Sequence, residues 1–223
     1  MRLLAVNTAA ARLSIALVEG EAARGITRDL MLADIAEPRD QGNFLLHGIA
    51  EGLKQNSLEF GDLDLMVAVT GPGSFTGIRI GLAAMRGFSL ASGVALKGAT
   101  SFDLYSTVAI ETPHRLVVME SWRDELYFKC DDAAPFNVTP SACAEMLASK
   151  GISGNAVTLM GDAAAKMAAL LPQAIVSDAL PNARDLAQLA LMRPELCGEA
   201  LPFYLREADV SFGRANRTLQ KEG

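Results

Sequence analysis

Short apolar runs of strand length alternate with helical segments along most of this chain. The first two runs, at residues 2–9 and 11–20, are joined by small and polar residues, which predicts a β-hairpin that opens a sheet. Further strands are expected within residues 25–34, 63–70 and 93–100. Because helical segments separate the later strands, the pattern predicts α/β architecture.

A helix with two stripes is expected over residues 41–57. Leu45 and Ile49 stand at i, i+4 spacing on an apolar stripe, and Gly48 and Gly52 form a small-residue stripe beside it. Glycine in mid-helix costs up to about 1 kcal/mol relative to alanine, so two of them indicate a packing reason.

The alternation restarts near residue 100, as if the chain were built twice. The further elements expected are helix 101–110, strands 115–121 and 125–131, helix 139–150 and helix 182–197. Thr139 and Asn182 suit the N-caps of the last two helices. We therefore divide the chain into an N-terminal lobe, 1–100, a C-terminal lobe, 101–205, and a C-terminal segment, 206–223. For that segment a solvated tail, a partner contact and packing on the N-terminal lobe stay open.

Composition and charge narrow the class of protein. Half of the 223 residues are hydrophobic, so a large core can be buried. The net charge of −6 opposes unaided binding of nucleic acid, so any RNA would have to be held by a basic partner. Cys130, Cys143 and Cys197 form no CxxC pair and are interpreted as reduced thiols in the cytoplasm. No segment is long and apolar enough to predict a signal peptide or a membrane span.

The turn after the strand at 63–70 is rich in glycine, with Gly71, Gly73 and Gly77 in "GPGSFTG". A P-loop needs a lysine directly after its last glycine, and a dinucleotide fingerprint needs its third glycine one residue earlier than Gly77. A nucleophile elbow needs glycine two residues before its serine, where Ser74 has a proline. What remains is a strand-loop-helix junction, capped by Ser74 or Thr76, whose amides could attract an anion.

The helix that follows this turn is poor in charge. Between Ser74 and Leu96 the only charged residues are Arg79 and Arg86, seven positions apart on one narrow stripe. Small side chains on another stripe would let a second helix approach closely. We favour a pair of helices that dock on a partner subunit, and the alternative is burial within the same chain. The predicted partner interface comprises Leu45, Gly48, Ile49, Gly52, Gly77, Gly81, Ala84, Met85 and Phe88.

Metal and acid-base chemistry have few candidates. His47 and His114 are the only histidines, so no HxxxH or HExxH helix exists, and His47 is interpreted as packed in an apolar face. Glu120, Asp124 and Glu125 could hold a hard cation, but a solvated hairpin turn explains them as well. No catalytic residue and no metal ligand is predicted.

Three stretches together resemble the TsaB (YeaZ) family: "GPGSFTGIRIG" at 71–81, "LLAVNTAAARLSIALVEG" at 3–20 and "PFYLREADV" at 202–210. The resemblance covers nearly the whole chain. It implies the actin-like ATPase (ASKHA) fold of two RNase H-like lobes. It also implies a non-catalytic subunit that pairs with TsaD through N-lobe helices. With TsaE, the pair attaches threonylcarbamoyl to N6 of A37 in tRNA, so tRNA is met only through the complex.

Departures from the family bear on nucleotide binding. Asn7 stands where actin-like ATPases and much of the family have an aspartate that helps hold metal and phosphate, and asparagine lacks the charge. Glu120 likewise stands where aspartate is usual. The residues that would line a nucleotide site are Asn7, Thr8, Gly71, Gly73 and Ser74. No cofactor is predicted, although ATP or ADP at the subunit interface stays open.

Two other functions compete with a scaffold role. The first is an active actin-like ATPase or phosphotransferase, and the second is a peptidase, which needs a nucleophile or metal that we do not find. The oligomeric state of the isolated chain also stays open, with a homodimer as the alternative to the heterodimer.

Overall fold

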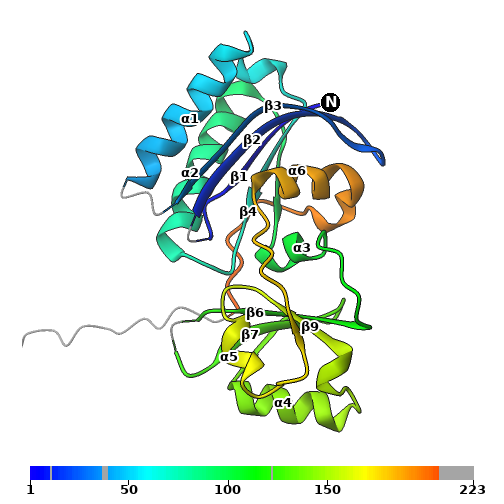
Figure 1. The fold of residues 1–223 in the computed structure, drawn as a ribbon. Helices are drawn as coiled ribbons and strands as arrows, with labels where there is room; N and C mark the ends of the chain where they lie inside the picture. Colours follow the sequence, from blue (N-terminus) through cyan, green and yellow to red (C-terminus); the bar gives the residue numbers. More distant parts are fainter. Residues whose placement is uncertain (11, 37–39, 122, 206–223) are drawn as a thin grey trace, which may run out of the picture.

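The first lobe is built on a five-stranded mixed sheet (Figure 1). The computed structural model describes residues 1–10, 12–36, 40–121 and 123–205. The strands are β1 (Arg2–Asn7), β2 (Arg12–Glu21), β3 (Gly25–Ala36), β4 (Leu65–Val69) and β5 (Leu96–Ala99). Their order is β3-β2-β1-β4-β5, with the first three antiparallel and the last two added in parallel beside β1. The predicted hairpin and the three later strands of this lobe are confirmed.

Helices cover both faces of this sheet. The helices α1 (Gln41–Gln55) and α2 (Phe75–Ser92) lie side by side on one face, and α6 (Ala183–Met192) packs on the other (Figure 1). A 3-10 turn, η1 (Phe60–Asp62), joins α1 to β4. The chain therefore returns to its first lobe after it has built the second.

The second lobe repeats the strand order of the first. Its elements are β6 (His114–Met119), β7 (Leu126–Cys130), β8 (Phe136–Val138), α4 (Pro140–Ser149), η2 (Gly154–Ala156), β9 (Val157–Met160), α5 (Ala164–Ala168) and β10 (Ile175–Val176). The sheet order is β8-β7-β6-β9-β10, again with three antiparallel strands and two parallel ones. The repeated order confirms the predicted α/β fold of two RNase H-like lobes.

Local sequence signals set most helix ends. Ser74 accepts a hydrogen bond from Gly77 N, Thr139 from Ala142 N and Asn182 from Arg184 N, which confirms all three predicted N-caps. The helix expected over 101–110 is shorter and ends at Tyr105 as α3 (Ser101–Tyr105). The Ser106 and Thr107 hydroxyls there donate to the backbone carbonyls of Asp103 and Leu104, which competes with helix continuation.

Each lobe has its own core, and a third apolar cluster lies between them. Alternate residues of β6 face opposite ways: Leu116 and Val118 point into the second core, and Val117 and Met119 point into the cluster between the lobes. The buried residues of α6 belong to the first core. The predicted C-terminal lobe, 101–205, includes α6, although the buried residues of this helix belong to the first core. The segment 206–223 lies outside the described residues.

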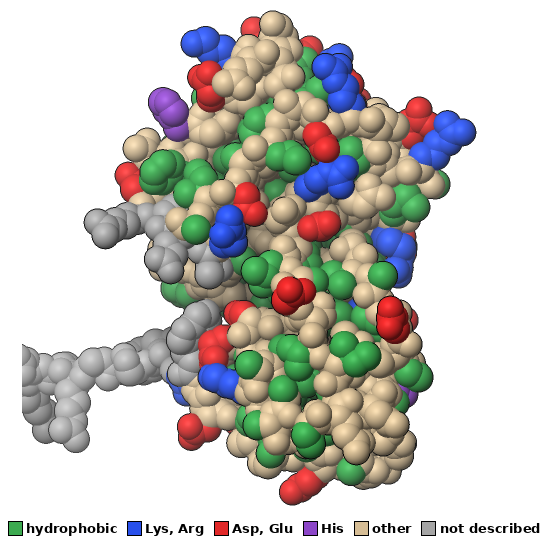
Figure 2. Space-filling view, viewed as in Figure 1, with side chains coloured by type: hydrophobic (Ala, Val, Ile, Leu, Met, Phe, Trp, Pro, Cys, Tyr) green, Lys and Arg blue, Asp and Glu red, His purple; other side chains and the backbone are tan. Residues whose placement is uncertain are grey.

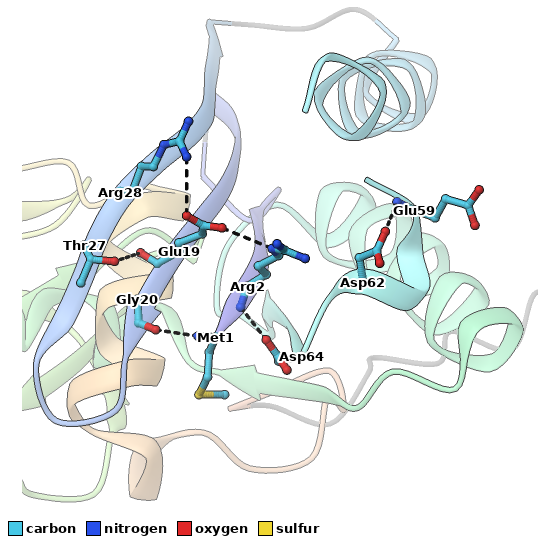
Figure 3. Close-up of polar contacts among 9 residues, drawn as sticks. All are labelled: Met1, Arg2, Glu19, Gly20, Thr27, Arg28, Glu59, Asp62 and Asp64. Atoms are coloured by element: carbon cyan, nitrogen blue, oxygen red, sulfur yellow. Dashed lines mark hydrogen bonds and ion pairs between the residues drawn. The ribbon is translucent and has the colours of Figure 1, made fainter. Parts of the chain in front are cut away.

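Polar contacts tie the start of the chain to the first sheet (Figure 3). The Met1 amino group donates to Gly20 O at 2.8 Å, and the Glu19 carboxylate pairs with Arg2 at 3.3 Å and Arg28 at 3.8 Å. The two ion pairs are partly exposed, and each contributes about 1 kcal/mol or less. Among the described residues, no helix has the length and apolar character to cross a membrane.

Candidate interaction site and interlobe cleft

The predicted interface on α1 faces the chain's own sheet. Leu45 and Ile49 are 0% and 1% exposed in the first core. A Cβ on Gly48 would lie 2.7 Å from Cδ1 of Ile15 in β2, and Gly52 is equally close to a β3 side chain. The small-residue stripe therefore lets α1 settle on the sheet, so these residues are covered without a partner.

The glycines of α2 serve the same purpose. A Cβ on Gly77 would lie 1.9 Å from Thr8 O, and one on Gly81 would lie 2.2 Å from Thr8 Oγ1. Met85 is fully buried, Ala84 is half-buried against the first core, and Phe88 stacks on Phe60 of η1 at 4.4 Å between ring centroids. Most residues of the predicted interface are therefore buried within the same chain, which is the alternative that the sequence left open.

A different face of the two helices is open to solvent. Its residues share small or apolar side chains and helical spacing; they are Leu46 and Ala50 of α1, with Ala83, Gly87, Leu90 and Ala91 of α2, and we call this set the outer helix face. Leu90 is 89% exposed. His47, which was expected to be packed, is exposed, because it lies on the side of α1 away from the sheet. Figure 2 shows hydrophobic side chains exposed among charged ones in its view.

A groove lies between the C-terminal halves of α1 and α2. Its volume is about 570 Å³, and it is lined by Ala50, Leu53, Lys54, Leu58, Glu59, Phe60, Gly61, Phe88, Ala91 and Ser92. Two of these, Ala50 and Ala91, also belong to the outer helix face. The groove thus extends that face toward η1.

Ser74 of the glycine-rich turn is hydrogen-bonded within the chain. Ser74 N donates to Ala9 O at 2.7 Å, and the Ser74 hydroxyl accepts from Gly77 N at 3.1 Å. Gly71 and Gly73 have φ values of +109° and +150°, and a Cβ on Gly73 would lie 2.3 Å from Ala9 O. The turn packs closely against the first hairpin, which accounts for its glycines without a phosphate.

The candidate nucleotide residues of the first hairpin are also buried. Asn7 is 5% exposed; its Oδ1 accepts from Ala9 N at 3.1 Å, and its Nδ2 donates to Pro181 O at 3.5 Å. Thr8 is 1% exposed under Gly77 and Gly81. The structure thus brings Asn7, Thr8 and the turn residues together, and Asn7 and Ser74 each form a hydrogen bond with Ala9, which lies between them.

Two cavities lie along the junction of the lobes. One of about 390 Å³ is lined by Pro72, Gly73, Ser74, Phe75, Thr76, Ile78, Ser121, Tyr127, Phe203, Tyr204 and Leu205. The other, of about 110 Å³, is lined by Asn7, Ala10, Arg12, Ser14, Asp34, Ser101, Leu104, Tyr105, Met119, Asp162, Leu180, Pro181 and Asn182. The smaller cavity has room for a few waters but not for a nucleotide.

The smaller cavity has an unusual electrostatic environment. Burial raises the pKa of Tyr105 to about 12, with the nearby Asp162 charge adding to the effect. Burial also raises the pKa of Asp162, and the Glu120 charge acts in the same direction while the Glu120 N–H opposes it. No local motif marks Tyr105 and Asp162 in the sequence, because their contact depends on how the lobes are apposed.

The acidic residues proposed for a hard cation do not converge. Glu120 Oε2 accepts from Lys166 Nζ at 2.5 Å, Glu125 accepts from Asn137 at 2.8 Å, and Asp124 is exposed. Within the described part of the chain, no three His, Cys, Asp or Glu side chains are grouped as metal ligands would be.

Comparison with known proteins supplies a family context for this geometry. The family model described as "TsaD: tRNA N6-adenosine threonylcarbamoyltransferase" matches residues 42–132. The uncharacterized proteins Rv3421c of Mycobacterium tuberculosis and Mb3455c of Mycobacterium bovis are each 28% identical to the chain over 176 residues, which is 78% of this chain and 79% of theirs.

The solved structures show the same fold. YeaZ from Pseudomonas aeruginosa has a TM-score of 0.69 at 20% identity, covering 92% of this chain and 100% of that one. A second structure, an uncharacterized protein with similarity to peptidase YEAZ from Pseudomonas aeruginosa, has a TM-score of 0.70 at 22% identity, covering 92% and 99%. The family match and the shared fold together confirm the resemblance of this chain to the TsaB (YeaZ) family.

Proposed function

We propose that this chain is a non-catalytic scaffold subunit in the synthesis of N6-threonylcarbamoyladenosine at A37 of tRNA. It docks on TsaD, assembles with TsaE and supports threonylcarbamoyl transfer, which takes place on TsaD. The tRNA is held by the complex, because a chain with a net charge of −6 gains little from phosphate contacts of its own.

The observation that carries the proposal is the outer helix face. Ala83, Gly87 and Leu90 follow one another at i, i+4, i+7 on α2, and all are exposed and uncharged. Burying a leucine that is as open as Leu90 contributes about 1.5–3 kcal/mol, and small neighbours allow a second helix to approach closely. The docking surface therefore stays on the two predicted helices, but on the side away from the sheet.

The interlobe cleft supports the non-catalytic part of the proposal. Asn7 and Ser74 already hydrogen-bond within the chain, so a phosphate would have to displace those bonds. The cavity beside Asn7 is about 110 Å³. An active ATPase of this fold would need an open cleft and free donors at that position.

Reconstitution tests the function as a whole. TsaD, TsaE, tRNA, ATP and the threonylcarbamoyl-adenylate donor are combined with and without this chain, and modified A37 is measured by mass spectrometry. We expect modification only when the chain is present. Equal modification without it contradicts the scaffold role. Micromolar binding of Mg-ATP with turnover by the isolated chain, measured by titration calorimetry and phosphate release, contradicts the non-catalytic assignment.

A matched pair of variants tests the docking face. Leu90→Arg on α2 is expected to weaken association with TsaD at least tenfold in light scattering, because it buries a charge in an apolar contact. Leu170→Arg, at an exposed leucine of the second lobe, serves as the control and should leave association unchanged. Equal association of both variants would place the interface elsewhere. The same measurement on the isolated wild-type chain distinguishes monomer from homodimer.

A further inference from the structure

A cluster of apolar side chains joins the two lobes. Phe102 and Tyr105 of α3 are buried there with Val117, Met119 and Met160 of the second sheet. The neighbouring α3 residue Leu104 belongs to the first core. The short helix α3 is therefore fixed to both lobes at once, which leaves no hinge of loop residues at this point.

The extended segment 197–205, which we call the strap, contacts both lobes at the same junction. Gly198 exchanges backbone hydrogen bonds of 3.0 and 2.9 Å with Gly98 of β5, and Phe203 N donates to Thr70 O at 2.8 Å. Arg86 of α2 donates to Ala200 O at 2.6 Å. The strap thus lies along the edge of the first sheet.

The end of the strap reaches the second lobe. Phe203 and Leu205 pack on the cluster between the lobes. The Tyr204 hydroxyl lies 3.4 Å from Arg79 Nε, so both arginines that were conspicuous in the sequence of α2 hold the strap. The described part of the 202–210 stretch, which carries the family resemblance, therefore helps to join the two lobes. The proposed function does not account for this role.

An ion pair crosses the junction as well. Lys129 Nζ of β7 lies 2.9 Å from Asp103 Oδ1 of α3, with side chains only 19% and 11% exposed. The other carboxylate oxygen, Asp103 Oδ2, accepts from Thr100 N and Oγ1 at 3.1 and 2.5 Å, which fixes its orientation. Separating the lobes would break this ion pair, and removing Lys129 while the lobes stay together would leave the Asp103 carboxylate largely buried without its cationic partner.

We infer that the strap and the Lys129–Asp103 pair lock the two lobes into one cooperative unit, so that the second lobe does not open or swing independently of the first. Separation would break the backbone bonds of the strap, expose the apolar cluster and unpair the two charges together. Such a unit opens only by global unfolding, whereas lobes joined by free linkers open one at a time. The inference concerns the mechanics of the chain and stands whether or not the chain docks on TsaD.

Native thiol labelling measures this locking directly. Cys143 is fully buried in the second core, so its reaction with a maleimide reports the opening of that lobe. Labelling of the Cys143 peptide is followed by mass spectrometry along a urea series, beside circular dichroism of the whole chain. In the wild type the two midpoints are expected to coincide. A separate Cys143 transition at lower urea overturns the inference.

Two variants that disturb different parts of the lock are compared with matched controls. Lys129→Met and Phe203→Ala should each raise the Cys143 labelling rate in native buffer at least about tenfold and separate its midpoint from that of circular dichroism. Lys166→Met removes an exposed ion pair inside the second lobe, and Leu201→Ala truncates an exposed strap residue. If these controls accelerate labelling as much as the two variants do, the lock is refuted.

Discussion

The two lobes share a strand order and differ in size. In the first lobe β2 and β3 have 10 and 12 residues, and α1 and α2 have 15 and 18. In the second lobe the strands have 2–6 residues, and α4 and α5 have 10 and 5. Only Cys143 and Leu147 of α4 and Ala164 and Met167 of α5 are buried, whereas α1 and α2 bury four and five residues and also carry the outer helix face.

The comparison shows that topology and interaction surface are separate properties. An RNase H-like strand order determines where helices attach, but element length decides whether a helix can fill a core and present an outer face as well. In the second lobe, apolar side chains that do not join its own core pack in the cluster between the lobes. Alternate residues of β6 face the cluster between the lobes, so this strand is buried on both faces.

The smaller second core should be the more sensitive to truncation. Phe128 is fully buried there, so Phe128→Ala is expected to lower the free energy of unfolding by about 3–5 kcal/mol through lost burial and the cavity left behind. Urea unfolding monitored by circular dichroism gives the value. Phe44→Ala, at an exposed phenylalanine of the first lobe, is the control and should cost about 0.5 kcal/mol or less. A loss below about 2 kcal/mol for Phe128→Ala would mean that the second lobe repacks easily.

The close contact between α2 and the first hairpin can be tested by adding one methyl group to a glycine of α2. Gly77→Ala places a Cβ against Thr8 O and should cost about 2–3 kcal/mol by overpacking, whereas Gly87→Ala on the open side of α2 should be neutral or stabilise by up to about 1 kcal/mol. Thermal unfolding of both variants distinguishes them. If Gly77→Ala is tolerated as well as Gly87→Ala, α2 does not press on the first hairpin as described.

These glycines also show how far sequence reasoning extends. Strand alternation, the caps at Ser74, Thr139 and Asn182, and the restart near residue 100 are local signals, so an α/β architecture that restarts could be predicted from them. The RNase H-like form of the lobes was implied by the family resemblance alone. The spacing of the glycines indicates that the two helices pack closely, but it does not identify the element against which they pack. The helix stripes were assigned to a partner because nothing in the sequence places Ile15 or Thr8 beneath them.

Contacts between distant residues account for the rest of what was missed. Lys129 and Asp103 are 26 positions apart and Arg86 and Ala200 are 114 apart, with no motif at either end. The return of α6 to the first core is equally invisible, since its amphipathic pattern fits a helix in either lobe. The predicted interface residues of α1 and α2 mostly face the chain's own sheet, and the docking surface that we propose uses the opposite side of the same helices.

The helix caps of the two lobes should differ in strength. Asn182 accepts from Arg184 N at 2.8 Å within a full capping box, whereas Thr139 accepts from Ala142 N at 3.4 Å. We expect Asn182→Ala to cost about 1–2 kcal/mol and Thr139→Ala about 0.5–1 kcal/mol, read as the shift in thermal midpoint. A larger loss at Thr139 would reverse the ranking of the two caps.

The smallest expected effect lies at the surface of the second lobe. Burial works against ionisation of Asp131, but the Arg115 N–H and the His114 ring, both at 2.8 Å, hold the pKa of Asp131 below its ordinary value. A carboxylate with a lowered folded-state pKa stabilises the fold at pH values above its ordinary pKa, and that contribution is lost as the pH falls through the folded-state value.

Asp131→Asn should therefore cost less than about 1 kcal/mol near pH 6, since the side chain is 42% exposed, and the difference from wild type should shrink as the pH falls below the ordinary aspartate pKa of about 4. Urea unfolding at pH 3, 4, 5 and 6 measures the difference. His114→Gln removes one partner of the carboxylate and leaves Arg115 N and the Cys130 thiol, so it should reproduce part of the loss at pH 6. A difference that stays constant from pH 6 to pH 3 would assign the effect to packing rather than to charge, because packing does not titrate with the carboxyl group.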